Sequence, residues 1–195
     1  MHGPTFEETI LIAPSRLPKA TQQLVCQRTK EAVRALGLTE GPVHAELRLT
    51  EALGPVPLEI AARSIGGLCS RVLRFGAGVS LEELIIQCAL GRTPTTMKRE
   101  RTPAGVMMLP VPRAGRLQEV RGQAEACAVP AIVDLRITIA PGTEIQPLPD
   151  GDRYLGFLFA KADTPEDVET ALRQAYAELD PIIEARLAVP EGRPP

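Results

Sequence analysis

Residues 43–67 read VHAELRLTEALGPVPLEIAARSIGG and carry the clearest structural pattern of the chain. Two runs of alternating character, Val43 to Thr50 and Pro55 to Arg63, flank a short connection that contains Gly54. Alternation with a period of two is typical of β-strands, and a short glycine-containing connection is typical of a hairpin. This stretch therefore predicts a β-hairpin.

The register of the hairpin decides which side chains meet. If the turn centres on the middle of the connection, antiparallel pairing sets Thr50 opposite Pro55 and Glu46 opposite Glu59. Opposed residues on one face have Cβ atoms about 4.5–5.5 Å apart, and like charges there are destabilising unless something offsets them. A divalent cation such as Mg²⁺, which binds carboxylate and phosphate oxygens, would offset them. A register shifted by one residue would instead send one glutamate to the other face, as an ordinary solvated charge.

Basic groups share the face of the two glutamates. By the period of two, His44 and Arg48 lie with Glu46 on the first strand, and Arg63 lies with Glu59 on the second. Paired carboxylates beside an arginine suit a metal-bound nucleotide. His44 could contact a substrate on this face, or it could be a hydrogen-bonded structural histidine.

Length, composition and charge bound the class of protein. The chain has 195 residues, 44% hydrophobic and 24% charged, which is enough for one sizeable core or two small ones. Its formal net charge of −2 argues against a nucleic-acid surface, which normally carries a basic excess. The sequence has no apolar run of about 18 residues and begins without an export signal pattern, so we expect a cytoplasmic protein without a membrane partner.

The four cysteines form no CxxC pair, which argues against a zinc site and against a disulfide framework. Cys26 and Cys88 fall in helical patterns. We therefore expect them to be buried free thiols in a reducing cytoplasm.

The rest of the chain predicts an α+β protein in two parts. The first part, residues 1–92, reads as a strand at 6–12, a helix at 19–36, the hairpin, and a helix at 81–90 that packs against the back of the hairpin. The polar, proline-containing residues 92–103 mark the boundary. The second part, residues 93–195, reads as strands at 105–112, 117–120, 132–140 and 154–162, helices at 123–128 and 165–179, and a frayed tail from 188.

At the hairpin the residues resemble a known family. Residues 41–91 look like the C-terminal half of an ATP-grasp domain, in the carboxylate-amine ligase branch that includes L-amino acid ligases and carnosine-synthase-like proteins. In that family a strand ending in glutamate is followed by a strand with Glu-x-Asn-x-Arg or Glu-x-Ala-x-Arg and then by a glycine-containing turn. The matching residues here are His44-Ala45-Glu46, Glu59-Ile60-Ala61-Ala62-Arg63 and Gly66-Gly67.

The resemblance extends over nearly the whole chain. Residues 3–18 resemble the strand and turn that precede this unit, and residues 110–172 resemble the C-terminal domain appended to it in the same branch. It implies an α+β fold: the C-terminal part of an ATP-grasp fold, an antiparallel sheet with helices, followed by a small α+β domain.

The resemblance also implies roles for individual residues. Glu46 and Glu59 would bind the Mg²⁺ or Mn²⁺ ions that bridge the phosphates of ATP, and Arg63 would contact the transferring phosphoryl group. Ala61 stands where the family often has a metal-binding asparagine, which puts one metal contact in doubt.

Further residues would contact the substrate. The Gly66-Gly67 pair would let the backbone approach a ligand. Arg71 and Arg74 could bind a carboxylate substrate, or they could pair with the acidic helix start at Glu82 and Glu83.

The implied chemistry is activation of a carboxylate, such as that of an amino acid, by the γ-phosphate of ATP, followed by amide formation with an amine. Such an enzyme also needs an N-terminal half that the sequence lacks, so we expect a fragment that is inactive alone. We expect its uncovered apolar face to favour a homodimer. The alternative is a non-catalytic module that keeps the ATP-grasp scaffold for binding or association.

Overall fold

The structure is a computed structural model that describes residues 9–76 and 78–185. The predicted fraying of the tail from residue 188 lies outside the described residues. The chain divides into two compact units, one formed by Ala13–Thr102 and the other by Met1–Ile12 with Pro103–Pro195. Along the chain this division falls ten residues after the predicted boundary between residues 92 and 93. The predicted division into two domains stays a prediction.

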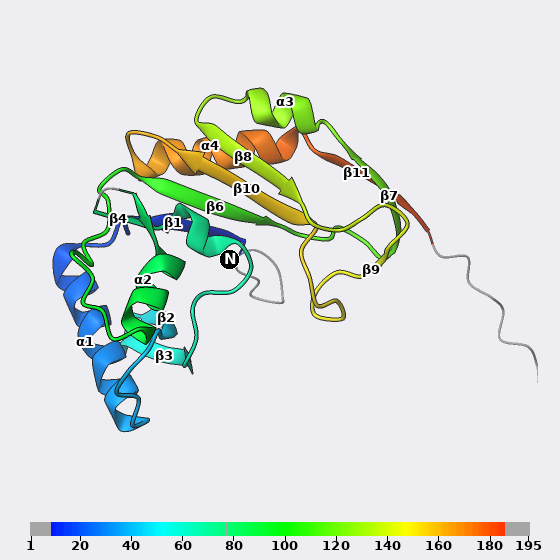
Figure 1. The fold of residues 1–195 in the computed structure, drawn as a ribbon. Helices are drawn as coiled ribbons and strands as arrows, with labels where there is room; N and C mark the ends of the chain where they lie inside the picture. Colours follow the sequence, from blue (N-terminus) through cyan, green and yellow to red (C-terminus); the bar gives the residue numbers. More distant parts are fainter. Residues whose placement is uncertain (1–8, 77, 186–195) are drawn as a thin grey trace, which may run out of the picture. The chain divides into compact units, whose positions relative to one another are not determined.

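The unit formed by Ala13–Thr102 contains the predicted hairpin. Its elements are α1 (Lys19–Ala35), β2 (His44–Thr50), β3 (Gly54–Ala61), the 3-10 helix η1 (Cys69–Val72), β4 (Arg74–Phe75), β5 (Val79–Ser80) and α2 (Leu81–Ala89). In Figure 1 the blue helix α1 lies beside the cyan hairpin, and α1 packs on β3. We expected α2 to pack on the back of the hairpin, but its main contacts are with η1 and β5. The prediction was wrong because the apolar stripe of α2 indicated that it packs, but not against which element.

The hairpin pairs as predicted at its outer end but not at its turn. Glu46 lies opposite Glu59, whereas Thr50 lies opposite Gly54 instead of Pro55. The register shifts between Glu46 and Leu47, so the second strand carries one extra residue in a β-bulge. The bulge adjoins Pro57, and prolines in sheets are confined to edges, strand starts and bulges.

The other unit is built on a four-stranded sheet in the order β1-β6-β10-β8. The bounds are β1 (Ile10–Ala13), β6 (Ala104–Leu109), β10 (Gly156–Lys161) and β8 (Ile132–Ile137). A second sheet, in the order β11-β7-β9, is formed by β11 (Asp180–Glu184), β7 (Gly115–Arg121) and β9 (Glu144–Ile145). Figure 1 shows α3 (Gln123–Ala128) and α4 (Pro165–Ala177) on one side of the four-stranded sheet.

The core of this unit lies between the four-stranded sheet and α4, which contacts β6 and β10. Its least exposed large side chains are Leu109, Leu117, Leu158, Leu172, Val106 and Val168. A Cβ atom at Gly105 would lie 2.6 Å from Val168 Cγ1 and 3.1 Å from the carbonyl oxygen of Leu11. Glycine at this position therefore lets both α4 and β1 approach β6.

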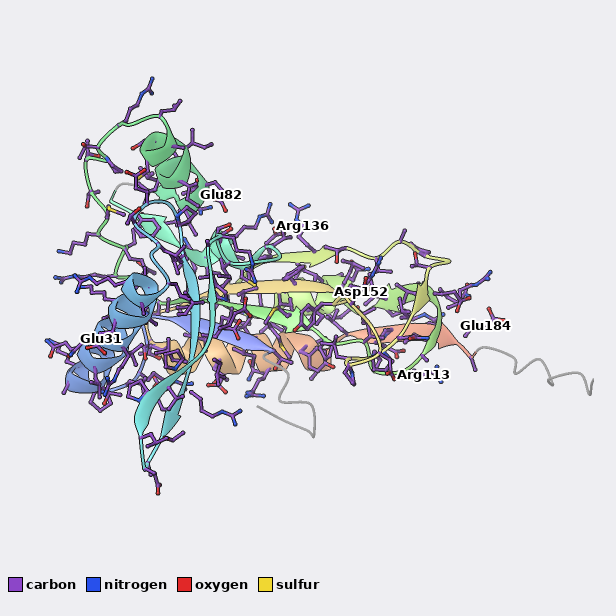
Figure 2. All side chains as sticks on the ribbon, turned by 90° about the horizontal axis from the view of Figure 1, so that it is seen from below. Glu31, Glu82, Arg113, Arg136, Asp152 and Glu184 are labelled. Carbon is purple, nitrogen blue, oxygen red and sulfur yellow. The ribbon has the colours of Figure 1, made fainter. Side chains whose placement is uncertain are left out.

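Helix caps and one long-range contact fix the ends of the elements. The hydroxyls of Ser80 and Thr164 accept hydrogen bonds from the backbone N–H groups of Glu83 and Asp167 and so cap the starts of α2 and α4. The Arg113 guanidinium donates to the carbonyl oxygen of Ile183 at 2.7 Å. Figure 2 shows Arg113 near β11, so this arginine ties the segment before β7 to that strand.

The two units bury apolar side chains to different extents. Nine of the ten exposed large hydrophobic residues of the described chain lie in the unit formed by Ala13–Thr102, and α1 has no buried residue. Cys26 and Cys88 are exposed, so the prediction that they are buried was wrong. Their helical periodicity was predicted correctly, but the faces that carry the thiols are not covered by other described residues.

Among the helices that the structure describes, none combines the length and the hydropathy that a membrane crossing requires.

Candidate metal and nucleotide site

The outer end of the hairpin brings two carboxylates and two nitrogen donors together. Glu46 and Glu59 are directly opposed across β2 and β3. The His44 Nε2 atom lies 3.1 Å from Glu46 Oε1. Beyond the end of β3, Arg63 Nη2 donates to Glu59 Oε1, also at 3.1 Å. Each carboxylate therefore has one partner from its own strand or from the residues that follow it.

The local backbone explains how these four side chains meet. His44 and Glu46 are two residues apart in a regular strand, so they lie on one face. The bulge of β3 lies on the turn side of Glu59 and leaves the pairing of Glu46 with Glu59 intact. After Ala61 the chain bends, and the backbone N–H of Arg63 donates to the carbonyl oxygen of Ala61 at 2.9 Å. This tight bend returns the guanidinium of Arg63 to Glu59.

The charges and exposure of the cluster fit a hard cation. The side chains of Glu46 and Glu59 are 33% and 47% exposed, so water and a ligand can reach both. Within the described residues, no group of three or more His, Cys, Asp and Glu side chains could hold a metal ion. Two carboxylates are nevertheless the usual protein contribution to a Mg²⁺ ion that also binds phosphate oxygens and water. The donor set therefore fits magnesium that arrives with a nucleotide.

The turn after Arg63 leaves space beside its guanidinium. The nearest heavy atom to a Cβ built on Gly66 is Arg63 Nη1, at 4.0 Å. Gly67 has φ of +59°, a left-handed conformation that favours glycine. A ligand can therefore approach the backbone here without meeting a side chain from either glycine. Their predicted contact with a substrate stays a prediction.

The two further arginines lie on the segment that follows. Arg71 is in η1, and Arg74 begins β4. The Ser70 hydroxyl hydrogen bond lowers the pKa of Glu82, and the charge of Arg74 adds to this effect. Figure 2 shows Glu82 on α2. The charge of Arg74 thus acts on the acidic start of α2. The sequence left this interaction open as an alternative to substrate binding. The predicted role of Arg71 and Arg74 in substrate binding stays a prediction.

We expect Ser70→Ala to destabilise the protein slightly and to weaken its pH dependence. Ser70 is buried, and its hydrogen bond to the exposed Glu82 is worth roughly 0.5 kcal/mol. Because the folded pKa of Glu82 lies below its ordinary value of 4.5, the ionised carboxylate stabilises the protein above that pH. This contribution is lost as the pH falls through the folded pKa. Urea unfolding at pH 7 and at a series of values below 5 should show a smaller acid loss in the variant, and an unchanged acid loss would contradict the prediction.

Comparison with known proteins identifies the family. The ATP-grasp domain family matches residues 1–72, and the family of L-amino acid ligase C-terminal domain 2 matches residues 107–184. The chain belongs to the ATP-grasp superfamily. Within it the chain falls in the carboxylate-amine ligase branch, together with L-amino acid ligases.

Individual relatives agree with this placement. The L-amino acid ligase from Bacillus licheniformis has a crystal structure that matches with a TM-score of 0.79 and 28% identity, over 95% of this chain and 46% of that one. Carnosine synthase 1 of Gallus gallus is 36% identical over 109 residues, which are 54% of this chain and 12% of the relative. The uncharacterized protein y4rH of Sinorhizobium fredii is 28% identical over 91% of this chain and 37% of its own length. The chain thus spans less than half the length of these relatives.

Proposed function

We propose that this chain supplies the magnesium-binding part of the active site of an ATP-dependent carboxylate-amine ligase. The observation that carries the proposal is the opposed pair Glu46 and Glu59, with Arg63 on Glu59. The pair offers two hard anionic ligands on one open face, and the guanidinium offers a positive charge beside them. Transfer of a phosphoryl group needs this combination of charges, because catalysis of that step depends on positioning and electrostatic stabilisation.

The reaction proceeds in two steps. A carboxylate oxygen of the substrate attacks the γ-phosphorus of ATP, the bond to the bridging oxygen breaks, and ADP leaves with the electron pair. The nitrogen of an amine then attacks the carbonyl carbon of the acyl phosphate, phosphate leaves, and the amine loses a proton. No side-chain nucleophile takes part.

The residues of the hairpin have separate roles in the first step. Glu46 and Glu59 would hold Mg²⁺ or Mn²⁺, and the bound ion would neutralise charge on the nucleotide phosphates. Arg63 stabilises the negative charge that spreads over the transferring phosphoryl oxygens. Gly66 and Gly67 leave room for the acyl group beside Arg63. An amino acid is the carboxylate that the L-amino acid ligase relatives suggest.

The test is carboxylate-dependent turnover of ATP by the natural protein that contains this chain. With Mg²⁺, ATP, hydroxylamine and a panel of L-amino acids, we expect ADP release that depends on the amino acid, together with hydroxamate formed from the acyl phosphate. ATP hydrolysis that is independent of any carboxylate would contradict the ligase function. Arg63→Met should abolish hydroxamate formation, whereas Arg92→Met, outside the hairpin, should not.

A second candidate is a non-catalytic module that keeps the ATP-grasp scaffold for binding or association. Ala61 favours it, because its methyl side chain provides no metal ligand at the position where the resemblance implies one. The same assay separates the two functions: a module would bind MgATP without releasing ADP.

We also propose that an N-terminal ATP-grasp lobe completes the site. The exposed apolar side chains of α1, the hairpin and α2 support this proposal, because exposed apolar surfaces often bind a partner. We therefore expect the 195-residue chain alone to bind ATP only weakly, with no micromolar affinity in a titration. A cytoplasmic location fits four free cysteines.

The same apolar surface predicts self-association of the chain. We expect a symmetric homodimer in which both copies use this surface. Sedimentation velocity should show a concentration-dependent shift toward the dimer. A single monomer species at high concentration would contradict the expectation.

A further inference from the structure

The contact between His44 and Glu46 distinguishes the two carboxylates of the site. The imidazole Nε2 atom lies 3.1 Å from Glu46 Oε1, and the His44 side chain is only 20% exposed. An ionised glutamate can only accept hydrogen bonds, so this contact requires the proton of the imidazole to be on Nε2. The pairing of these atoms thus defines the form of His44 that the site uses.

The partner of Glu59 is of a different kind. Arg63 brings a guanidinium to Glu59 Oε1, whereas His44 brings an imidazole N–H to Glu46 Oε1. The two carboxylates therefore differ in the chemical type of the side chain that contacts them.

Each carboxylate also uses only one oxygen in these contacts. His44 and Arg63 both bond an Oε1 atom. These two contacts hold one oxygen of each carboxylate in place.

We propose that His44 is a positioning residue that holds Glu46 for metal binding and does not itself contact the substrate. The proposal rests on the proposed function of the pair and goes beyond it, because it replaces the predicted substrate contact of His44 with a role that acts through Glu46. A free glutamate side chain would lose rotamer entropy on binding the ion, and a hydrogen bond formed beforehand removes part of that cost. Hydrogen bonds that orient metal ligands are typically worth about 10–100-fold in metal affinity.

The experiment measures Mn²⁺ binding by electron paramagnetic resonance, in the natural protein that contains this chain and with a non-hydrolysable ATP analogue present. We expect His44→Ala to weaken Mn²⁺ binding by about 10–100-fold. His44→Gln, whose amide N–H can replace the imidazole donor, should recover most of the affinity. If His44 only stabilised the fold, Mn²⁺ affinity would not depend on whether the side chain at position 44 has an N–H donor.

Three controls make the outcome decisive. Glu51→Gln alters an exposed residue between β2 and β3 and should bind Mn²⁺ like the wild type. Glu46→Gln should lose more affinity than His44→Ala. Thermal unfolding without metal shows whether each variant folds. If His44→Ala does not fold, His44→Gln still tests the role of the N–H donor.

Two results would overturn the inference. If Glu46→Gln abolishes binding while His44→Ala binds like the wild type, or if His44→Gln is as weak as His44→Ala, the positioning role is wrong and the proposed function stands. If Glu46→Gln also binds like the wild type, the metal site itself is wrong.

Discussion

Glu59→Gln is expected to lower kcat/KM for amino acid-dependent ADP release by about 10²–10³-fold, a loss of about 3–4 kcal/mol of transition-state stabilisation. The amide keeps the size of the side chain but removes its charge. The metal then loses a hard anionic ligand, and Arg63 loses the carboxylate that accepts its hydrogen bond at 3.1 Å. One substitution therefore affects both groups that we propose to stabilise the transferring phosphoryl.

The measurement is a coupled ADP assay of the natural protein over a range of Mg²⁺ concentrations. Glu51→Gln is the matched control, because it makes the same chemical change at an exposed position between β2 and β3. This control should retain wild-type activity. A Glu59→Gln enzyme with wild-type kcat/KM at all Mg²⁺ concentrations would show that the opposed pair does not bind the metal.

Leu158→Ala is expected to cost about 3–5 kcal/mol of unfolding free energy. Leu158 is fully buried in β10, which pairs with strands on both sides. Truncation removes most of a buried side chain. It leaves a cavity, because β10 is hydrogen-bonded to β6 and β8 and packs against α4, and so cannot shift to fill the space. A loss of this size is a large fraction of the total stability of a typical domain.

Urea unfolding of wild type and variant tests this expectation. Val133→Ala is a suitable control, because Val133 lies on the neighbouring strand β8 with 57% of its surface exposed. We expect that change to stay within about 0.5 kcal/mol. A Leu158→Ala cost below that of the control would mean that the four-stranded sheet does not form the core of its unit.

The sequence predicted the helices and strands themselves better than it predicted which of them pair or pack together. The opposition of Glu46 and Glu59, the helices after Ser80 and Thr164, and most strands follow from period, caps and turns, all of which are local. The strand β1 was grouped with the hairpin by its position in the chain, although it pairs in the sheet of β6. Which sheet a strand joins is a long-range property that local pattern does not contain.

Other features were missed for identifiable reasons. The strands β4, β5 and β9 have two residues each, too few to show a period. The strand β11 contains Pro181, which argues against a strand in a sequence reading, but β11 lies at the edge of its sheet, where proline is tolerated.

At the candidate site, the sequence predicted that Glu46 and Glu59 are opposed, but it did not predict how the side chains around them interact. That His44 bonds Glu46 depends on side-chain rotamers. The hydrogen bond from Arg63 to Glu59 depends on the bend after Ala61, and no turn motif in the sequence predicted this bend. Both features became visible only with the side chains in place.

The prolines of β3 have a consequence for the behaviour of the chain in a crowded solution. A two-stranded ribbon with free edges is a template on which other extended chains can polymerise. Pro55 and Pro57 deprive β3 of two N–H donors, and the bulge beside them breaks the regular spacing of the rest. A foreign strand that approaches this edge finds an interrupted row of partners, so the ribbon can stay open for its own ligands without seeding fibres.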